Sequence, residues 1–324
     1  MKQYEAVPKN TLTRRTPVII RVDGRAFHTF TRGFKKPFDD VLMRAMQDTM
    51  KYLCENIQGC VLGYTQSAEI TLILVDYKKL NSEAWFDYEV QKICSIAASM
   101  ATMAFNESFS KNYSKLYRSK MEHGENIDEL VKTYAFKAGR AMFDCRCFNI
   151  PKEEVTNLIY WRQLDATRNS IQMVGQANFS HKQLHGKSCN MIQDMLLTEK
   201  DINWNDYPTY QKRGSCCIKE EYYPEPLAGY ENCPIDATSV RTRWIIDKEI
   251  PIFKGEDREK LKDQIQQRFN ENSKKMGRFD REKMDRPYYT KNAELTKDLE
   301  KNGFGHELDR LALMAVAVFH LSHY

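Results

Sequence analysis

The chain has 324 residues, 42% of them hydrophobic and 29% charged, a balance that is ordinary for a globular protein and argues against disorder as its main state. The net charge of +5, from 49 basic and 44 acidic residues, permits binding to polyanions but does not indicate it. The first residues contain no apolar run typical of a signal peptide, and no run reaches the roughly 18 apolar residues that span a bilayer. We therefore expect a cytoplasmic protein with no membrane partner.

The nine cysteines are an odd number and contain no C-x-x-C pair. This pattern favours reduced, mostly buried thiols over a zinc site or a disulfide framework.

The first 150 residues predict an α+β fold. Residues 17–23 are a β-branched run that ends in Asp23, as a buried strand would, and Gly24 then allows a sharp turn. Apolar residues at helical spacing, and two strand-like runs around a tight polar segment, predict the next elements. These are a helix at 39–56, a hairpin at 60–77, a second helix at 84–106 and a strand at 140–150. The order is the βαββαβ pattern of a ferredoxin-like palm with helices on one face, and it places Asp23 and residue 68 on adjacent strands.

The later residues predict additional C-terminal α/β elements. We expect helices at 151–174 and 179–197, the second after a Ser180 cap, and strands at 207–219 and 238–246. Residues 254–301 are densely charged and predict solvated helices, whereas 308–321 are apolar and predict packing. The predicted division is a palm catalytic domain at 1–150, a helical and strand region at 151–253 and a charged helical extension at 254–324.

The segment after Asp23 has the residue types that bind a triphosphate. Backbone amides and cations precede a helix that begins near Asp39, and such a helix start suits phosphate oxygens. The side chains concerned are Arg25, Phe27, His28, Lys35 and Lys36. The alternatives are a turn aspartate bonded to its own backbone and a solvated basic loop.

The hairpin tip is the second candidate segment. Ser67 could donate to a phosphate oxygen, and Glu69 could supply a carboxylate at the start of the returning strand. Residues 68 and 69 should point to opposite sides of that strand, so Glu69 is an imperfect substitute for a carboxylate at 68. Without Asp23 nearby, a polar turn of no functional consequence would be the better interpretation.

Two further groups of residues have simpler interpretations. His181 and His185 are four apart on a predicted helix, but no third ligand is evident, so surface or RNA-facing histidines are favoured over zinc. Scattered basic residues among aromatic ones could contact phosphates or serve solubility. They are Arg162, Arg168, Lys182, Lys187, Lys212 and Arg213, near Trp161, Phe179 and Tyr210.

Together these segments resemble the tRNA-His guanylyltransferases and their bacterial relatives. The matching motifs are R-V-D-G-R-A-F-H at 21–28, K-P-F-D at 36–39, Y-T-Q-S-x-E at 64–69, F-D-C-R at 143–146, W-R-Q-x-D at 161–165 and Y-Q-K-R-G at 210–214. The resemblance implies a 3′–5′ polymerase with a polymerase-like palm. Such an enzyme activates the 5′-phosphate of tRNA with ATP or GTP and then adds nucleotides to that end.

The resemblance also assigns roles. It implies that Asp23, the Gly24 carbonyl and residue 68 hold two Mg²⁺ ions, with Glu69 as an acidic neighbour in the catalytic set. It implies nucleotide contacts from Arg25, Ala26, Phe27, His28, Asp39 and Ser67, and phosphate neutralisation by Lys36 and Lys92. The implied partners are tRNA and nucleoside triphosphates, in a homo-oligomer that is commonly a tetramer.

Two positions depart from the family pattern. The stretch 165–169 reads D-A-T-R-N, like the bacterial type rather than the histidine-tRNA specialists, which favours template-dependent repair of truncated tRNA 5′ ends. Residue 68 is alanine where an acidic metal ligand is expected. A laboratory substitution, a natural inactive paralogue and compensation by Glu69 would each explain it, and the first is favoured because the other motif residues are intact. A binding protein without chemistry and a palm enzyme of another kind, such as a nucleotide cyclase, are the competing functions.

Overall fold

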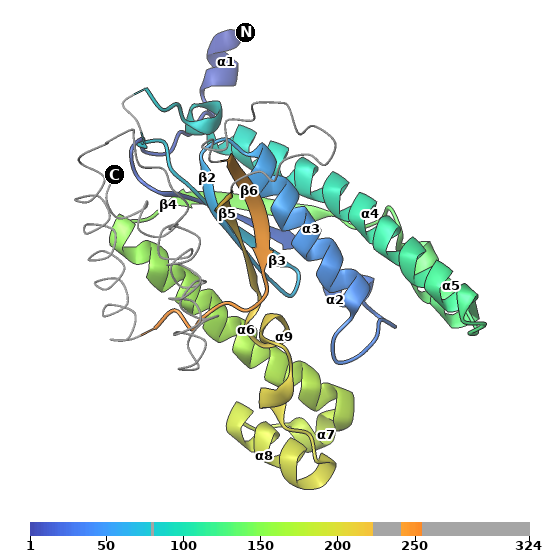
Figure 1. The fold of residues 1–324 in the computed structure, drawn as a ribbon. Coiled ribbons are helices and arrows are strands. Elements are labelled where there is room, and N and C mark those ends of the chain that lie inside the picture. Colours follow the sequence, from blue (N-terminus) through green and yellow to red (C-terminus); the bar gives the residue numbers. More distant parts are fainter. Residues whose placement is uncertain (79–80, 223–240, 255–324) are drawn as a thin grey trace, which may run out of the picture. The chain divides into compact units, whose positions relative to one another are not determined.

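The structure, a computed structural model, describes residues 1–78, 81–222 and 241–254. Its centre is an antiparallel six-stranded sheet with the order β4-β1-β3-β2-β5-β6 (Figure 1). The strands are β1 (Val18–Gly24), β2 (Cys60–Gln66), β3 (Glu69–Leu74), β4 (Phe143–Asn149), β5 (Ser215–Tyr222) and β6 (Arg241–Asp247). The predicted mixture of helices with an antiparallel sheet is confirmed.

The two faces of the sheet have different environments. Val18, Ile20 and Val22 alternate along β1 and are completely buried in the main hydrophobic core. Because successive side chains of a strand point to opposite faces, Arg21 and Asp23 lie on the other face. The central strand therefore anchors the fold with one set of residues and presents polar groups with the other.

Two long helices cover the core face. They are α3 (Asp40–Asn56) and α4 (Val90–Glu122), which Figure 1 shows on the same side of the sheet. The predicted helix at 39–56 is confirmed, with Asp39 as its N-cap. The second predicted helix begins six residues before α4 and ends 16 residues before α4 ends. It continues because Phe105 and Phe109, one helical turn apart, are both fully buried.

The remaining helices follow in chain order. α1 (Lys2–Ala6) and α2 (Phe27–Phe30) are short, and α5 (Asp128–Tyr134) follows α4. Short 3₁₀ turns lie at Trp85–Tyr88, Ala135–Lys137, Lys152–Glu154 and Trp204–Asp206. After β4 come α6 (Val155–Asn178), α7 (His181–Leu184), α8 (Cys189–Lys200) and α9 (Thr209–Arg213).

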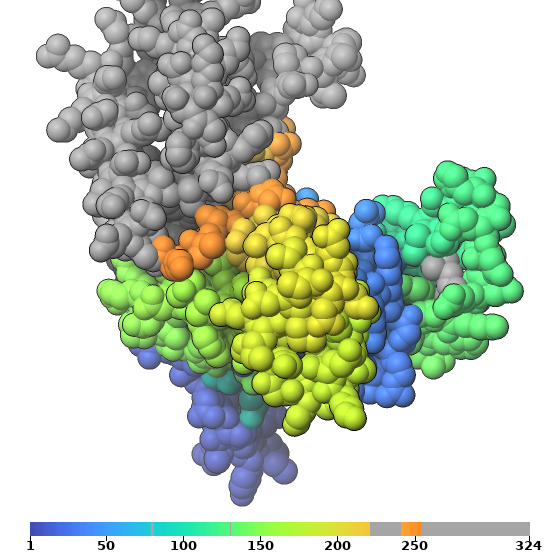
Figure 2. All heavy atoms as spheres, turned by 90° about the horizontal axis from the view of Figure 1, so that it is seen from below, coloured from blue at the N-terminus to red at the C-terminus, as the bar shows by residue number. Residues whose placement is uncertain are grey.

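The predictions for the region after β4 are confirmed in part, and the single helix predicted at 179–197 is instead two helices, α7 and α8. Ser180 caps α7 in a capping box with Gln183, as predicted. The predicted strand at 207–219 is wrong in its first half, because Pro208 starts the helical turn of α9 and Gly214 ends it before β5. Figure 2 shows the α7–α9 group (yellow) beside the segment of α3 (blue), where Phe38 joins a small core with α6 and α8.

Residues 1–250 form one compact unit, and β5 and β6 extend the same sheet that β1–β4 build. The charged helices and the apolar segment expected within 255–324 lie outside the described residues. In the part of the chain that the structure describes, every helix is too short or too polar to cross a bilayer. The eight cysteines within it are free thiols, and four of them are buried.

Candidate active site

A row of carboxylates crosses three strands at the end of β1. The register pairs Asp23 with Asp144 of β4 on one side and with Glu69 of β3 on the other. Directly opposite residues of antiparallel strands point to the same face, so all three acids lie on the face opposite the main core. The sequence motifs indicated Asp23 and Glu69, but Asp144 was missing from the predicted site. Its signal was the F-D-C-R segment, which runs antiparallel to R-V-D-G.

The pKa of Asp23 is raised above its ordinary value. Burial is the larger cause and the like charge of Asp144 the next, while Arg146 and Arg21 oppose the rise. Burial and a neighbouring carboxylate both disfavour the ionised form of Asp23. A cation, free or bound to a phosphate, would stabilise that ionised form.

Replacing Asp144 with asparagine should reduce this repulsion. Because the pKa of Asp23 is raised in the folded protein, its contribution to stability is complete below its ordinary pKa of 3.8 and is lost as pH rises through the higher folded value. Asp144→Asn should reduce that loss and increase the free energy of unfolding at pH 7 by roughly 0.5 kcal/mol. Urea unfolding of both proteins at pH 7 and at pH 3 measures this difference in the free energy of unfolding. An equal difference at both pH values would contradict this origin.

Residue 68 lies beside Gly24, one position from Asp23. The Gly24 N–H donates to the Ala68 carbonyl at 3.0 Å, which continues the β1–β3 ladder into the hairpin turn. Ala68 packs against the main core, whereas Glu69 pairs with Asp23 on the opposite face. The two residues thus face opposite sides of the strand, as the alternation predicts. Ser67 at the hairpin tip is exposed and has a left-handed backbone with φ of 52°.

Gly24 is required because the next turn folds back on it. A Cβ on Gly24 would lie 2.3 Å from the ring of Phe27. That ring is buried against Phe30, Phe105 and Phe143, with centroids 5.0 to 5.5 Å apart, and cannot move away freely. The predicted nucleotide contact of Phe27 therefore does not involve its side chain, which belongs to the core.

We expect Gly24→Ala to destabilise the protein by about 2 kcal/mol, the typical cost of overpacking a filled core. Thermal unfolding would show this as a lower Tm. A Gly24→Ala, Phe27→Leu double variant should recover part of the loss, because leucine leaves room for the new methyl group. A double variant no more stable than Gly24→Ala would show that the ring is not the obstacle.

Glu69 is held in an ion-pair network. Nη1 of Arg162 lies 3.1 and 3.0 Å from the two Glu69 carboxylate oxygens, and Nη2 lies 3.0 Å from Asp165. Arg21 lies 4.0 Å from Glu69 and Arg168 lies 2.8 Å from Asp165. Burial raises the pKa of Glu69, and the charges of Arg162 and Arg21 oppose that rise. Glu69 is therefore committed to Arg162, which makes compensation for Ala68 by Glu69 the weakest of the three explanations.

The loop residues after Gly24 are mostly exposed. Arg25, Ala26 and His28 are exposed, and Ala26 has a left-handed backbone with φ of 53° before α2. Lys36 is exposed on the loop that leads to α3. Asp39 is buried and already accepts hydrogen bonds from the Leu42 and Lys35 backbone N–H groups at 2.9 and 3.1 Å and from the Tyr134 hydroxyl. Its first role is to cap α3.

Lys92 was predicted to neutralise phosphates, but the structure places it away from the carboxylate row. It lies near the start of α4, beside the Val90 carbonyl that approaches Cys147 of β4, and its ammonium covers the Phe86 ring at 5.0 Å. Within α4, Thr102 is the residue that contacts β4 next to Asp144, through the Phe143 N–H. Lys92 precedes Thr102 by ten helical residues, which is about 15 Å along the helix axis. The spacing of the sequence carried no information on this distance.

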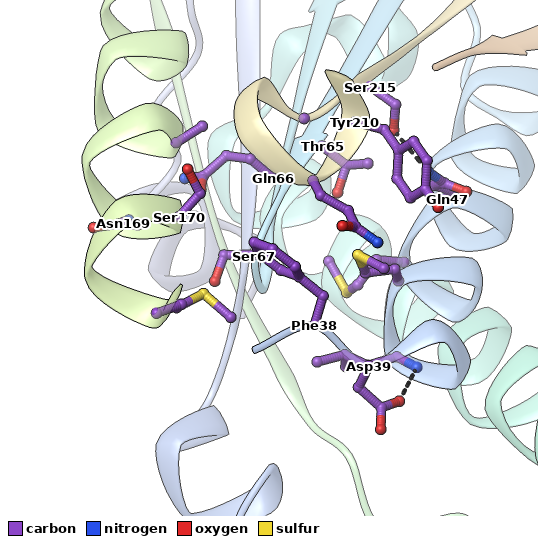
Figure 3. A pocket seen from close by; sticks show the side chains of 17 residues that line it. Phe38, Asp39, Gln47, Thr65, Gln66, Ser67, Asn169, Ser170, Tyr210 and Ser215 are labelled. Atoms are coloured by element: carbon purple, nitrogen blue, oxygen red, sulfur yellow. Dashed lines mark hydrogen bonds between the residues drawn. The ribbon is translucent and has the colours of Figure 1, made fainter. Parts of the chain in front are cut away.

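A pocket opens beside the hairpin tip (Figure 3). It lies among α3, the end of β2, α6 and α9, and its lining includes Asp39 and Ser67. Most other lining groups are uncharged and polar, interspersed with Phe38, Tyr210 and methionines. The polar ones are Gln47, Thr65, Gln66, Asn169, Ser170, Gln211 and Ser215. Amides, hydroxyls and an aromatic ring without opposing charges suit a flat neutral heterocycle better than a phosphate.

The acidic residues do not fit a two-ion site as they stand. Within the described ranges no three His, Cys, Asp or Glu side chains lie close enough together to hold a metal ion. Asp23 remains available, Glu69 is paired with Arg162, and Ala68 offers only its carbonyl, which already accepts from Gly24. Two clamped ions require more carboxylate oxygens than this set provides.

Comparison with known proteins gives a consistent result. The sequence profile described as tRNAHis guanylyltransferase matches residues 1–151. A bacterial tRNA(His) guanylyltransferase-like protein in complex with ATP is 43% identical, with 78% of this chain and 91% of that chain covered and a TM-score of 0.63. The GTP complex of such a bacterial protein is 40% identical over the same shares, with a TM-score of 0.57.

A protein of Acanthamoeba polyphaga mimivirus is 31% identical over 235 residues, which are 68% of this chain and 76% of the viral one. From its sequence and its fold, this chain belongs to the tRNAHis guanylyltransferase family.

Proposed function

We propose that this protein is a nucleotidyltransferase of tRNA 5′ ends, which binds ATP or GTP beside Asp23 and Gly24, and that Ala68 impairs its chemistry. The observation that carries the proposal is the adjacency of Asp23, Gly24 and residue 68 across β1 and β3, with one carboxylate absent. The largely uncharged pocket next to Ser67 supports a place for the nucleobase, and the exposed Arg25, His28 and Lys36 support one for phosphates.

The palm assignment has a topological argument. The first four strands are antiparallel in the order β4-β1-β3-β2, with α3 and α4 as the two connecting helices. This order supports the βαββαβ arrangement expected of a ferredoxin-like palm. In such a site Mg²⁺ would be held by Asp23, the Gly24 carbonyl and an acid at 68, and it would neutralise charge on the transferring phosphate.

The experiment is nucleotide addition to a tRNA that lacks its first 5′ nucleotide and carries a 5′-monophosphate. With Mg²⁺, ATP and GTP, the Ala68→Asp protein should lengthen the RNA at its 5′ end, and a nucleotide complementary to the template strand should be preferred. A cyclic nucleotide formed without any tRNA would instead identify a cyclase. An Ala68→Asp protein that binds neither triphosphate nor tRNA would refute the proposal.

A binding protein without chemistry is the second candidate, and Ala68 with the committed Glu69 favours it. It predicts that the chain and its Ala68→Asp variant bind tRNA equally and are equally inactive. Equal binding with unequal addition would exclude this candidate.

A further inference from the structure

Trp161 is the exposed tryptophan of this chain. Its side chain lies on α6 and is 50% exposed, whereas Trp85, Trp204 and Trp244 are at most 9% exposed. Burying a large aromatic ring is strongly favourable, so a ring left half open has lost a large part of that gain. A half-exposed indole therefore indicates a binding surface more strongly than an exposed small side chain does.

The ring is held from one side by Arg162. The guanidinium carbon of Arg162 lies 3.9 Å from the Trp161 ring centroid, in cation–π contact. The same guanidinium is fixed by both oxygens of Glu69 and by Asp165, and only 6% of Arg162 is exposed. One face of the indole thus rests on an immobile cation while half of the residue remains open to a ligand. This is a preorganised stacking surface.

The stacking surface formed by Trp161 and Arg162, called the platform below, lies next to the carboxylate row. One guanidinium joins the Trp161 ring to Glu69, and Glu69 is the cross-strand partner of Asp23. Arg168, seven residues along α6 and so on the same helical face, is 62% exposed and can offer its free edge to a phosphate. Aromatic rings beside cations are the surfaces on which proteins stack RNA bases, and each stacked base contributes substantially to affinity.

We propose that Trp161, supported by Arg162, stacks a base at the end of the RNA whose 5′-phosphate lies at Asp23. The proposal rests on the proposed function, because it takes the RNA end as the ligand. It gives each residue of this helical segment a distinct role: Trp161 supplies the ring, Arg162 its rigid support and Arg168 the neighbouring cation.

Trp161 emission and RNA affinity test this contact together. Because the other three tryptophans are buried, acrylamide-accessible emission comes mainly from Trp161. Saturating 5′-truncated tRNA should quench that emission and protect it from acrylamide. Trp161→Ala should raise the Kd for this tRNA about tenfold, while Trp161→Phe, which keeps a stacking ring, should stay within about threefold of the parent protein. Leu197→Ala, which removes an apolar side chain of similar exposure (54%) from α8, serves as the control and should leave the Kd unchanged.

Three results would overturn the platform. The first is Trp161→Ala protein that binds as tightly as Trp161→Phe. The second is unchanged emission at RNA saturation established by filter binding. The third is emission that follows protein concentration without RNA, which would make the surface a contact between copies of this chain. The proposed function is tested separately by nucleotide addition with Ala68→Asp protein. In the Ala68→Asp background, addition at subsaturating tRNA that Trp161→Ala leaves unchanged refutes the platform alone, and quenching without addition refutes the chemistry alone.

Discussion

Ala68→Asp protein is expected to add nucleotides to 5′-truncated tRNA about 10²–10³ times faster than the parent chain, the usual consequence of restoring a group that stabilises transition-state charge. Residue 68 is the cross-strand neighbour of Gly24, so the new carboxylate would enter next to the Gly24 backbone, one position along the strand from Asp23. The physical effect is the return of one negative charge and two oxygens to a site that now has too few. Single-turnover addition with saturating triphosphate measures it.

Ala68→Asn is the matched control for this gain. Asparagine has the size of aspartate but lacks its charge, so its rate should stay near that of the parent chain. If asparagine restored as much activity as aspartate, the cause would be the shape of the hairpin turn and not metal or phosphate chemistry. Circular dichroism and Tm values of the three proteins should agree, because Ala68 is only partly buried.

Arg162→Met is expected to lower the free energy of unfolding by about 3 kcal/mol, because it leaves Glu69 buried without its main partner. The side chains of Arg162 and Glu69 are 7% and 13% exposed, so water cannot replace the lost bonds. The pKa of Glu69 should rise further once the guanidinium is gone, since burial already raises it. Urea unfolding at pH 7 gives the free energy. The loss should diminish at low pH, where Glu69 is protonated in both states.

A Glu69→Gln, Arg162→Met double variant identifies the cause. If the unpaired charge is what destabilises Arg162→Met, neutralising Glu69 should restore most of the stability, and the coupling between the two sites should exceed about 1 kcal/mol. Additive losses would instead mean that the packing of Arg162 against Trp161 carries the effect. Conversely, Arg162→Lys keeps the charge but loses the bidentate geometry and should be intermediate.

The sequence was sufficient for features that depend on neighbouring residues. The run before Asp23 predicted β1, the helical spacing from Asp39 onward predicted α3, and the polar segment at 66–68 predicted the hairpin. Each of these follows from local alternation, spacing or capping. The end of α4 was missed because its second half is rich in polar residues, and only packing of its few aromatic rings reveals it as helix.

Features that depend on residues far apart in sequence were less accessible. Glu69 and Arg162 are separated by 93 residues, and neither residue signals that the other will neutralise it. Asp144 joins Asp23 only through the β1–β4 register. Lys92 has the right charge for a phosphate, but α4 carries it to the other end of β4. A motif therefore specifies which residues are available, whereas the register specifies which of them meet.

The most direct test of the gap at residue 68 is the number of metal ions bound. Mn²⁺ can be titrated into the protein with a non-hydrolysable ATP analogue while free Mn²⁺ is followed by electron paramagnetic resonance. The parent chain, which has Asp23 and Asp144 in the carboxylate row but no acid at 68, should bind one Mn²⁺ tightly, through the triphosphate. The Ala68→Asp protein should bind two. Two tightly bound ions on the parent chain, or one on both proteins, would contradict the assignment of residue 68 as the missing ligand.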